Sequence, residues 1–255
     1  MANDHKTTAA EKKLRRKTLG WCILLLLAVG GFILVQSGVI WLNMPSRTKY
    51  PVRGVDVSHY QGDIDFSTVK AQGVSFVFIK ATEGSGTLDE RFAENWQNAR
   101  DAGLLTGAYH FFSFGSAAET QADNFIAAVP YAEDALPPVI DLEYYSDSGS
   151  DALSADAVRG MLRVLLSRLR ETYGKTPIIY TTSACYADYL ADGALGEDFI
   201  LWIRSVFAAP DSDLDWQLWQ YNPRGVLKGY TGGERFIDLN VFRGTEEELR
   251  TLGAA

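Results

Sequence analysis

Pro137-Pro138-Val139-Ile140-Asp141-Leu142-Glu143 joins a short apolar run to two acidic residues near the middle of a 255-residue chain. The apolar residues predict a buried strand. Residues two apart on a strand project to the same face, so the carboxyl groups of Asp141 and Glu143 can enter one pocket. A single acid at a strand end more often caps a helix or meets water, but two acids on one apolar strand favour a functional site.

Similar apolar runs lie on both sides of this stretch, and helical patterns separate the earlier ones. The predicted strands are 54–57, 76–81, 106–112, 138–142, 177–181, 200–203, 216–220 and 236–241. The predicted helices are 66–72, 89–102, 117–129, 154–173 and 184–190. Strand–helix alternation indicates a parallel sheet. The sequence therefore predicts an α/β fold, a modified TIM-like barrel with five βα units followed by three further strands, and its active site at the carboxyl-terminal strand ends.

Further acids occur at or near the predicted strand ends. Asp56 ends the first strand, Glu83 follows the second, and Asp238 lies in the last. Glycoside cleavage needs one carboxyl that stays protonated and another that stays ionised, and crowded acids separate their pKa values in this way. By spacing alone the cluster also fits other acid–base chemistries.

Aromatic residues lie along the same rim, and sugar rings stack on the faces of such side chains. They are Tyr60, Tyr109, Phe111, Tyr144, Tyr180, Trp202, Trp219 and Tyr221. An aromatic residue in an apolar strand is more often part of the core than of a binding platform. Their common position along one rim favours a carbohydrate-binding role for some of them.

The amino-terminal part carries a targeting signal. Residues 19–42 contain no charged residue and are long enough to span a bilayer as a helix. Residues 1–18 are basic, which predicts a cytoplasmic tail and a domain outside the membrane. The alternative is a cleaved signal peptide, which would give a secreted protein. Residues 43–51, twice interrupted by proline, read as a linker.

Charge and composition exclude several classes of function. The net charge is −8, and residues 1–18 contribute +4 from six basic and two acidic residues, so the rest of the chain carries −12. Such an acidic domain repels nucleic acid. The three histidines are scattered, so we expect no metal site and no cofactor. Cys22 lies in the apolar amino-terminal run and Cys185 in the domain that follows, so we expect no disulfide between them. We also expect a monomer.

Six motifs, read in order, resemble the glycoside hydrolase family 25 lysozymes. They are Gly54-Val55-Asp56-Val57-Ser58-His59-Tyr60-Gln61-Gly62, Phe78-Ile79-Lys80-Ala81-Thr82-Glu83-Gly84, Gly107-Ala108-Tyr109-His110-Phe111, Asp141-Leu142-Glu143, Trp219-Gln220-Tyr221 and Ile237-Asp238-Leu239-Asn240. The resemblance covers roughly residues 52–243 and places a catalytic domain at 52–252.

The resemblance implies an N-acetylmuramidase, which cleaves the β-1,4 bond between N-acetylmuramic acid and N-acetylglucosamine in peptidoglycan glycan strands. It makes Glu143 the general acid and Asp141 its partner carboxylate, with Asp56 and Asp238 as the remaining catalytic acids. Net retention of configuration is implied, through either a covalent or a substrate-assisted route. The candidate substrate-binding residues are Tyr60, Gln61, Glu83, Tyr109, Phe111, Tyr180, Trp202 and Gln220.

Two other functions stay open from the sequence. A non-catalytic peptidoglycan-binding module would keep the groove without turnover, and a hydrolase of another N-acetylated polysaccharide would share the chemistry. The polar segment 144–151 after the acidic pair is expected to form a loop over the cleft. A membrane anchor at residues 19–42 would confine cutting to wall close to the membrane.

Overall fold

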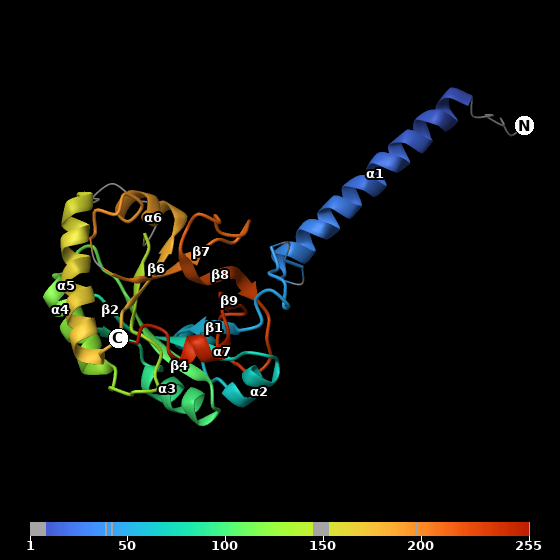
Figure 1. The fold of residues 1–255 in the computed structure, drawn as a ribbon. Coiled ribbons are helices and arrows are strands. Elements are labelled where there is room, and N and C mark those ends of the chain that lie inside the picture. Colours follow the sequence, from blue (N-terminus) through green and yellow to red (C-terminus); the bar gives the residue numbers. More distant parts are fainter. Residues whose placement is uncertain (1–8, 39, 42, 145–152, 197, 255) are drawn as a thin grey trace, which may run out of the picture. The chain divides into compact units, whose positions relative to one another are not determined.

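The computed structural model describes the chain apart from residues 1–8, 39, 42, 145–152, 197 and 255 (Figure 1). The chain divides into two compact units, Met1–Trp41 and Leu42–Ala255. The predicted loop over the cleft lies outside the described residues except for Tyr144, which follows the strand Val139–Leu142 and Glu143.

The first unit is built on one long helix, α1, Ala9–Gln36. Its stretch Lys12–Gln36 is long and apolar enough to cross a membrane, a test that a signal sequence also passes. Consecutive apolar side chains, including Trp21 and Leu26, are exposed around this helix, as in a membrane-spanning segment.

The helix ends earlier than the predicted span of residues 19–42. Gly38 adopts a φ of 73°, the left-handed conformation that commonly closes a helix, and the N–H of Ile40 donates to the carbonyl of Leu34. Residues 37, 38, 40 and 41 are therefore not helical, and the prediction of a helix running to residue 42 is wrong at this end.

The second unit is a closed mixed barrel, which confirms the predicted α/β barrel. Its strands are β1 (Arg53–Val57), β2 (Phe76–Glu83), β4 (Leu105–Phe111), β5 (Val139–Leu142), β6 (Ile178–Thr182), β7 (Ile200–Arg204), β8 (Trp216–Gly225) and β9 (Ile237–Phe242). A two-residue strand, β3 (Thr87–Leu88), pairs with the end of β2 and is missing from the prediction. Neighbouring strands from β1 through β2 and β4 to β8 are parallel, whereas β9 runs antiparallel to both β8 and β1 and closes the barrel.

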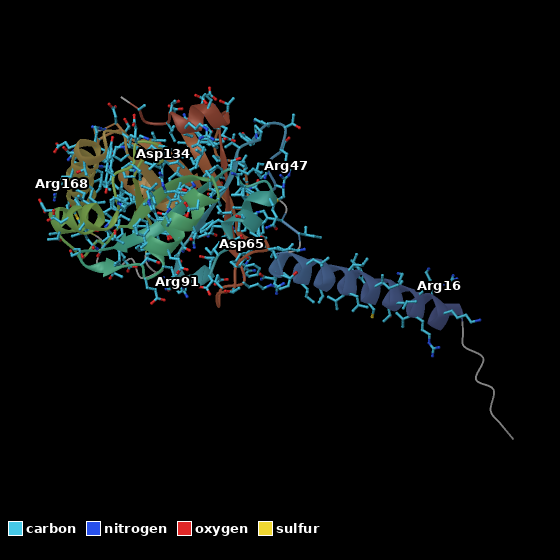
Figure 2. The ribbon with its side chains drawn as sticks, turned by 90° about the horizontal axis from the view of Figure 1, so that it is seen from below. Arg16, Arg47, Asp65, Arg91, Asp134 and Arg168 are labelled. Atoms are coloured by element: carbon cyan, nitrogen blue, oxygen red, sulfur yellow. The ribbon has the colours of Figure 1, made fainter. Side chains whose placement is uncertain are left out.

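Helices cover the outside of the early strands, as predicted. They are α2 (Phe66–Ala71), α3 (Phe92–Asp101), α4 (Ala118–Ala128), α5 (Ala155–Tyr173) and α6 (Ser183–Tyr189), with a 3₁₀ turn η1 (His59–Gln61) and a short terminal helix α7 (Glu246–Arg250). The longest, α5, begins at the side-chain cap Ser154 and ends at Gly174 in the left-handed conformation. Figure 2 shows Asp134 and Arg168 among the charged side chains of this outer layer; Arg168 pairs with Asp123 at 2.7 Å.

Alternation along the strands divides the core into two layers. On β2, Val77 and Ile79 face the helices, whereas Phe76 and Phe78 fill the barrel interior. Room for these two rings comes from Gly54 and Gly107, because an added Cβ there would lie 2.2 Å and 2.4 Å from the Phe76 and Phe78 rings. The interior is therefore packed below its mouth.

Residues 43–51, predicted as a linker, cover the part of the barrel that has no helices. The Tyr50 ring lies 5.7 Å from that of Trp216 and 6.0 Å from that of Trp219. Arg53 donates to the Tyr221 hydroxyl and to the carbonyl of Pro45. We call residues 43–51 the strap, because they bury the outer face of β8.

Candidate active site

The alternation of side chains along the strands places acidic, amide and aromatic side chains at one mouth of the barrel. The cleft there has a volume of about 360 Å³. Its walls are formed by Asp56, Val57, Ser58, Tyr60, Gln61, Lys80, Tyr109, Phe111, Val139, Asp141, Glu143, Tyr180, Trp202, Gln220, Pro223, Glu234, Phe236 and Asp238. The cleft contains all four predicted catalytic acids and every predicted substrate-binding residue except Glu83.

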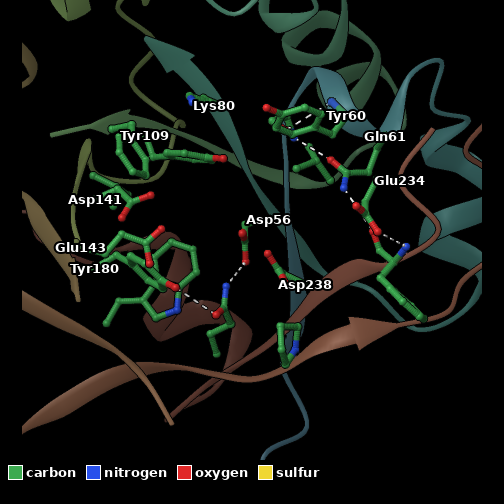
Figure 3. A pocket seen from close by; sticks show the side chains of 18 residues that line it. Asp56, Tyr60, Gln61, Lys80, Tyr109, Asp141, Glu143, Tyr180, Glu234 and Asp238 are labelled. Atoms are coloured by element: carbon green, nitrogen blue, oxygen red, sulfur yellow. Dashed lines mark hydrogen bonds between the residues drawn. The ribbon is translucent and has the colours of Figure 1, made fainter. Parts of the chain in front are cut away.

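Asp141 and Glu143 form one wall, beside Tyr109 and Tyr180 (Figure 3). Asp141 is 8% exposed, and its Oδ1 has no hydrogen-bond partner in the described part of the chain. Glu143 lies just beyond the end of β5 and is partly exposed to the cleft. Of these two carboxyls, Glu143 is the one that a bound molecule reaches more easily.

Asp56 and Asp238 form the facing wall, and the sheet register pairs them. Because β9 runs antiparallel to β1, Asp238 near its start lies directly opposite Asp56 near the end of β1. Oδ2 of Asp56 accepts hydrogen bonds from Nδ2 of Asn240 at 2.7 Å and from Nε2 of Gln220 at 3.1 Å. This carboxyl is therefore held by two amide donors.

The orientation of both amides is fixed from behind. The Tyr180 hydroxyl donates to Oε1 of Gln220 at 3.0 Å, and the Trp202 indole N–H donates to Oδ1 of Asn240 at 3.0 Å. Because each amide oxygen is used as an acceptor, each NH₂ group faces Asp56. Tyr180 and Trp202 thus act here through the amides as well as lining the cleft.

Burial raises the pKa of all four acids. Desolvation is the main cause in each case, and it lifts the pKa of Asp141 and Asp238 well above the ordinary range. Glu143 adds to the rise at Asp141 through charge repulsion. At Asp56 the rise in pKa is opposed by the hydrogen bonds from Asn240 and Gln220. Asp141 and Asp238, on facing walls, therefore favour their protonated forms, whereas the two amide donors of Asp56 favour its ionised form.

Two basic residues moderate this acidity. Lys80 lines the cleft, its Nζ lies 2.7 Å from Oε2 of Glu83, and it lowers the pKa of Asp141 and Glu143. Arg204, at the end of β7, has the same effect on Asp56, Glu143 and Asp238. Among the described residues, Glu83 lies outside the cleft and is joined to it through Lys80. Lys80 is not among the predicted site residues, although its alternation with Phe76 and Phe78 signals an inward-facing side chain.

The far end of the cleft is formed by a loop and η1. The Tyr60 ring is 62% exposed and lies 4.1 Å from the His59 ring, so it offers an open aromatic face. Gln61 is buried and joins Ser58 to the carbonyl of Phe236. Glu234 and Phe236 lie before β9, although Phe236 was predicted as the first residue of that strand, and neither is among the predicted substrate-binding residues.

Other candidates turn away from the cleft. Trp219 and Tyr221 alternate with the inward Gln220 and face the strap, so their position at a strand end does not place them at the site. His110 is buried between Thr82 and Gln121, and desolvation lowers its pKa to about 4. The described residues include no group of three or more His, Cys, Asp or Glu side chains suited to a metal ion.

Known proteins are similar to this chain in sequence and fold. The model of glycosyl hydrolases family 25 matches residues 55–230. The uncharacterized protein YegX of Escherichia coli strain K12 is 38% identical over 211 residues, covering 80% of this chain and 74% of that protein. Lysozyme M1 of Streptomyces globisporus is 34% identical over 212 residues, covering 79% and 71%.

A solved structure extends the likeness to the whole barrel. A family 25 glycosyl hydrolase from Bacillus anthracis matches with a TM-score of 0.76 and 45% identity, covering 83% of this chain and 97% of that one. The resemblance expected from the six motifs is confirmed. The chain belongs to glycosyl hydrolases family 25.

Proposed function

We propose that this protein is a peptidoglycan hydrolase that cleaves the β-1,4 bond between N-acetylmuramic acid and N-acetylglucosamine. The observation that carries the proposal is the pairing, within one cleft, of a proton-holding wall with an amide-held carboxylate. The names of two relatives, Lysozyme M1 and the Autolytic lysozyme of Clostridium acetobutylicum, support the same substrate class.

Glu143 is the proton donor to the leaving glycosidic oxygen. Its pKa is raised by burial, and it faces the cleft more openly than Asp141. Asp141 keeps a proton next to Glu143, because repulsion between the two carboxyls makes them titrate as a pair. Once Glu143 has given up its proton, it becomes the base for the second step.

Asp56 supplies negative charge opposite the donor. Its two amide donors favour the ionised form and fix its orientation, so it stabilises the positive charge of the oxocarbenium-like transition state. Asp238 shares a hydrogen bond with Asp56 and keeps its own proton. We propose that configuration is retained: the acetamido group of the substrate or a carboxylate of the enzyme would attack the anomeric carbon as the glycosidic oxygen leaves with the proton of Glu143, and water, deprotonated by Glu143, would displace that nucleophile in the second step.

The open cleft fits an extended glycan. Tyr60 presents exposed aromatic surface in this cleft, and such surface stacks on sugar rings, while Phe111 lines the cleft beneath the ammonium of Lys80. Residues 1–18 would lie in the cytoplasm and α1 would anchor the barrel outside the membrane, since the basic residues precede the apolar stretch. Arg16 belongs to this basic group (Figure 2).

The test compares purified peptidoglycan with chitin oligomers as substrates. We expect release of reducing ends from peptidoglycan, with N-acetylmuramic acid at the new reducing end of each fragment by mass spectrometry. Glu143→Gln should lower kcat by about 10³-fold or more while wall binding persists. Wild-type protein that binds wall without releasing ends would be a binding module, and a preference for chitin would identify another substrate.

A further inference from the structure

The turn after β7 carries the most exposed large apolar side chain among the described residues. Phe207 is 92% exposed, and residues 205–210, Ser-Val-Phe-Ala-Ala-Pro, contain no charge. Single exposed apolar residues are common on protein surfaces, so exposure alone assigns no role. The way in which the turn is held adds the necessary second observation.

Four hydrogen bonds hold the backbone on both sides of Phe207. Oγ of Ser205 donates to the carbonyl of Ala208 at 2.8 Å, and the Trp219 indole N–H donates to the carbonyl of Ser205 at 2.8 Å. Nδ2 of Asn43, in the strap, donates to the carbonyl of Ala208 at 2.8 Å and more weakly to that of Ser205. The ring is therefore presented outward on an ordered turn.

Asn43 belongs to the strap, which follows α1 in the chain. The next residue, Met44, is also exposed, at 55%. An extended residue spans at most about 3.6 Å, so the seven steps from Gln36 to Asn43 reach at most about 25 Å. The covalent chain therefore keeps Asn43, which holds the turn, within this distance of the end of α1.

We propose that Phe207 and Met44 form a lipid contact at the outer surface of the membrane that α1 spans; this rests on the proposed anchoring. Apolar side chains such as Phe and Leu insert at that interface. Asp211, Asp213 and Asp215, exposed at the base of the turn, oppose attraction by anionic lipid, so the contact is made by the apolar tip.

The contact has a consequence for where the enzyme cuts. The turn begins at Ser205, directly after the carboxyl-terminal end of β7, and the cleft opens at this end of the barrel. A lipid contact there holds the mouth of the cleft close to the bilayer. The glycan strands nearest the membrane are then the accessible substrate.

Fluorescence in vesicles tests the contact. Full-length protein lacking Cys22 and Cys185 carries an environment-sensitive dye at Phe207→Cys or, as a control, at Tyr131→Cys, whose native side chain is 67% exposed on the α4–β5 connection. In phosphatidylcholine vesicles we expect a blue shift and quenching by a headgroup-labelled lipid at position 207 only. Water-like emission at both positions overturns the proposal.

Further readings separate the other outcomes. Asn43→Ala should reduce quenching at position 207 while hydrolysis of soluble glycan fragments is unchanged, since Asn43 does not line the cleft. A blue shift that persists in detergent and grows with protein concentration would indicate a second copy and contradict lipid contact. Release of the protein by alkaline carbonate would refute the anchoring, and peptidoglycan hydrolysis would still be intact.

Discussion

Asp56 and Asp141 lie on facing walls of the cleft and have the same type of side chain in opposite surroundings. On the β1–β9 wall, Asp56 receives two amide hydrogen bonds, whose donors are held in turn by Tyr180 and Trp202. On the β5 wall, Oδ1 of Asp141 is buried without a partner among the described residues. Hydrogen-bond supply, and not residue type, therefore separates a carboxylate prepared for charge from an acid prepared to hold a proton.

Removing the charge of Asp56 breaks this difference most directly. Asp56→Asn leaves a neutral side chain of similar size where negative charge is proposed to stabilise the transition state. Loss of one such stabilising group costs about 10²- to 10³-fold in kcat. Turbidity clearance of peptidoglycan, with circular dichroism to verify folding, measures the effect, and a folded variant with nearly full activity would remove Asp56 from the catalytic set.

Removing one of the amide hydrogen bonds to Asp56 tests whether these bonds set its pKa. Asn240→Ala removes the shorter of the two amide hydrogen bonds to Asp56. In the wild-type protein this hydrogen bond lowers the pKa of Asp56, so its loss should raise that pKa. The acidic limb of the activity–pH profile should move to higher pH, and kcat should fall about tenfold, as for loss of a hydrogen bond to a charged group.

The control for this change is Gln217→Ala, on the same β8 strand as the second donor and outside the cleft. It should leave the pH profile unchanged. An Asn240→Ala enzyme with lowered activity and an unmoved acidic limb would show that the amide has a structural role only.

The buried Asp141 on the β5 wall should lower the free energy of unfolding at neutral pH. The pKa of Asp141 is raised in the folded protein, so its contribution favours folding below the unfolded value of 3.8 and is lost as pH rises through the folded value. Asp141→Asn should therefore raise the free energy of unfolding at pH 7 by about 1 kcal/mol, with the gain vanishing below pH 3.8. Thermal unfolding at both pH values, beside the exposed Asp211→Asn, measures it; an equal change at both would contradict the assignment.

Much of the β5 wall was predictable from sequence, and much of the other wall was not. Asp141 and Glu143 lie two apart on one strand, so local alternation places them together. Asp56 and Asp238 meet only because β9 is antiparallel to β1, which periodicity does not reveal. The inward Gln220 and outward Trp219 differ by one position, and their faces depend on which side the strap covers.

The smallest expected effect concerns the second line of support. Tyr180→Phe keeps the ring in the cleft and removes the hydroxyl that donates to Gln220, while Gln220 keeps its own bond to Asp56. A neutral hydrogen bond contributes about 0.5–1.5 kcal/mol, so kcat should fall by roughly two- to tenfold. Tyr173→Phe is the matched control, because its hydroxyl donates at 3.0 Å to Val129, outside the cleft, and its loss should lower stability without changing kcat. Equal kcat losses in the two variants would mean that the hydroxyl of Tyr180 stabilises the barrel and does not orient the amide that holds Asp56.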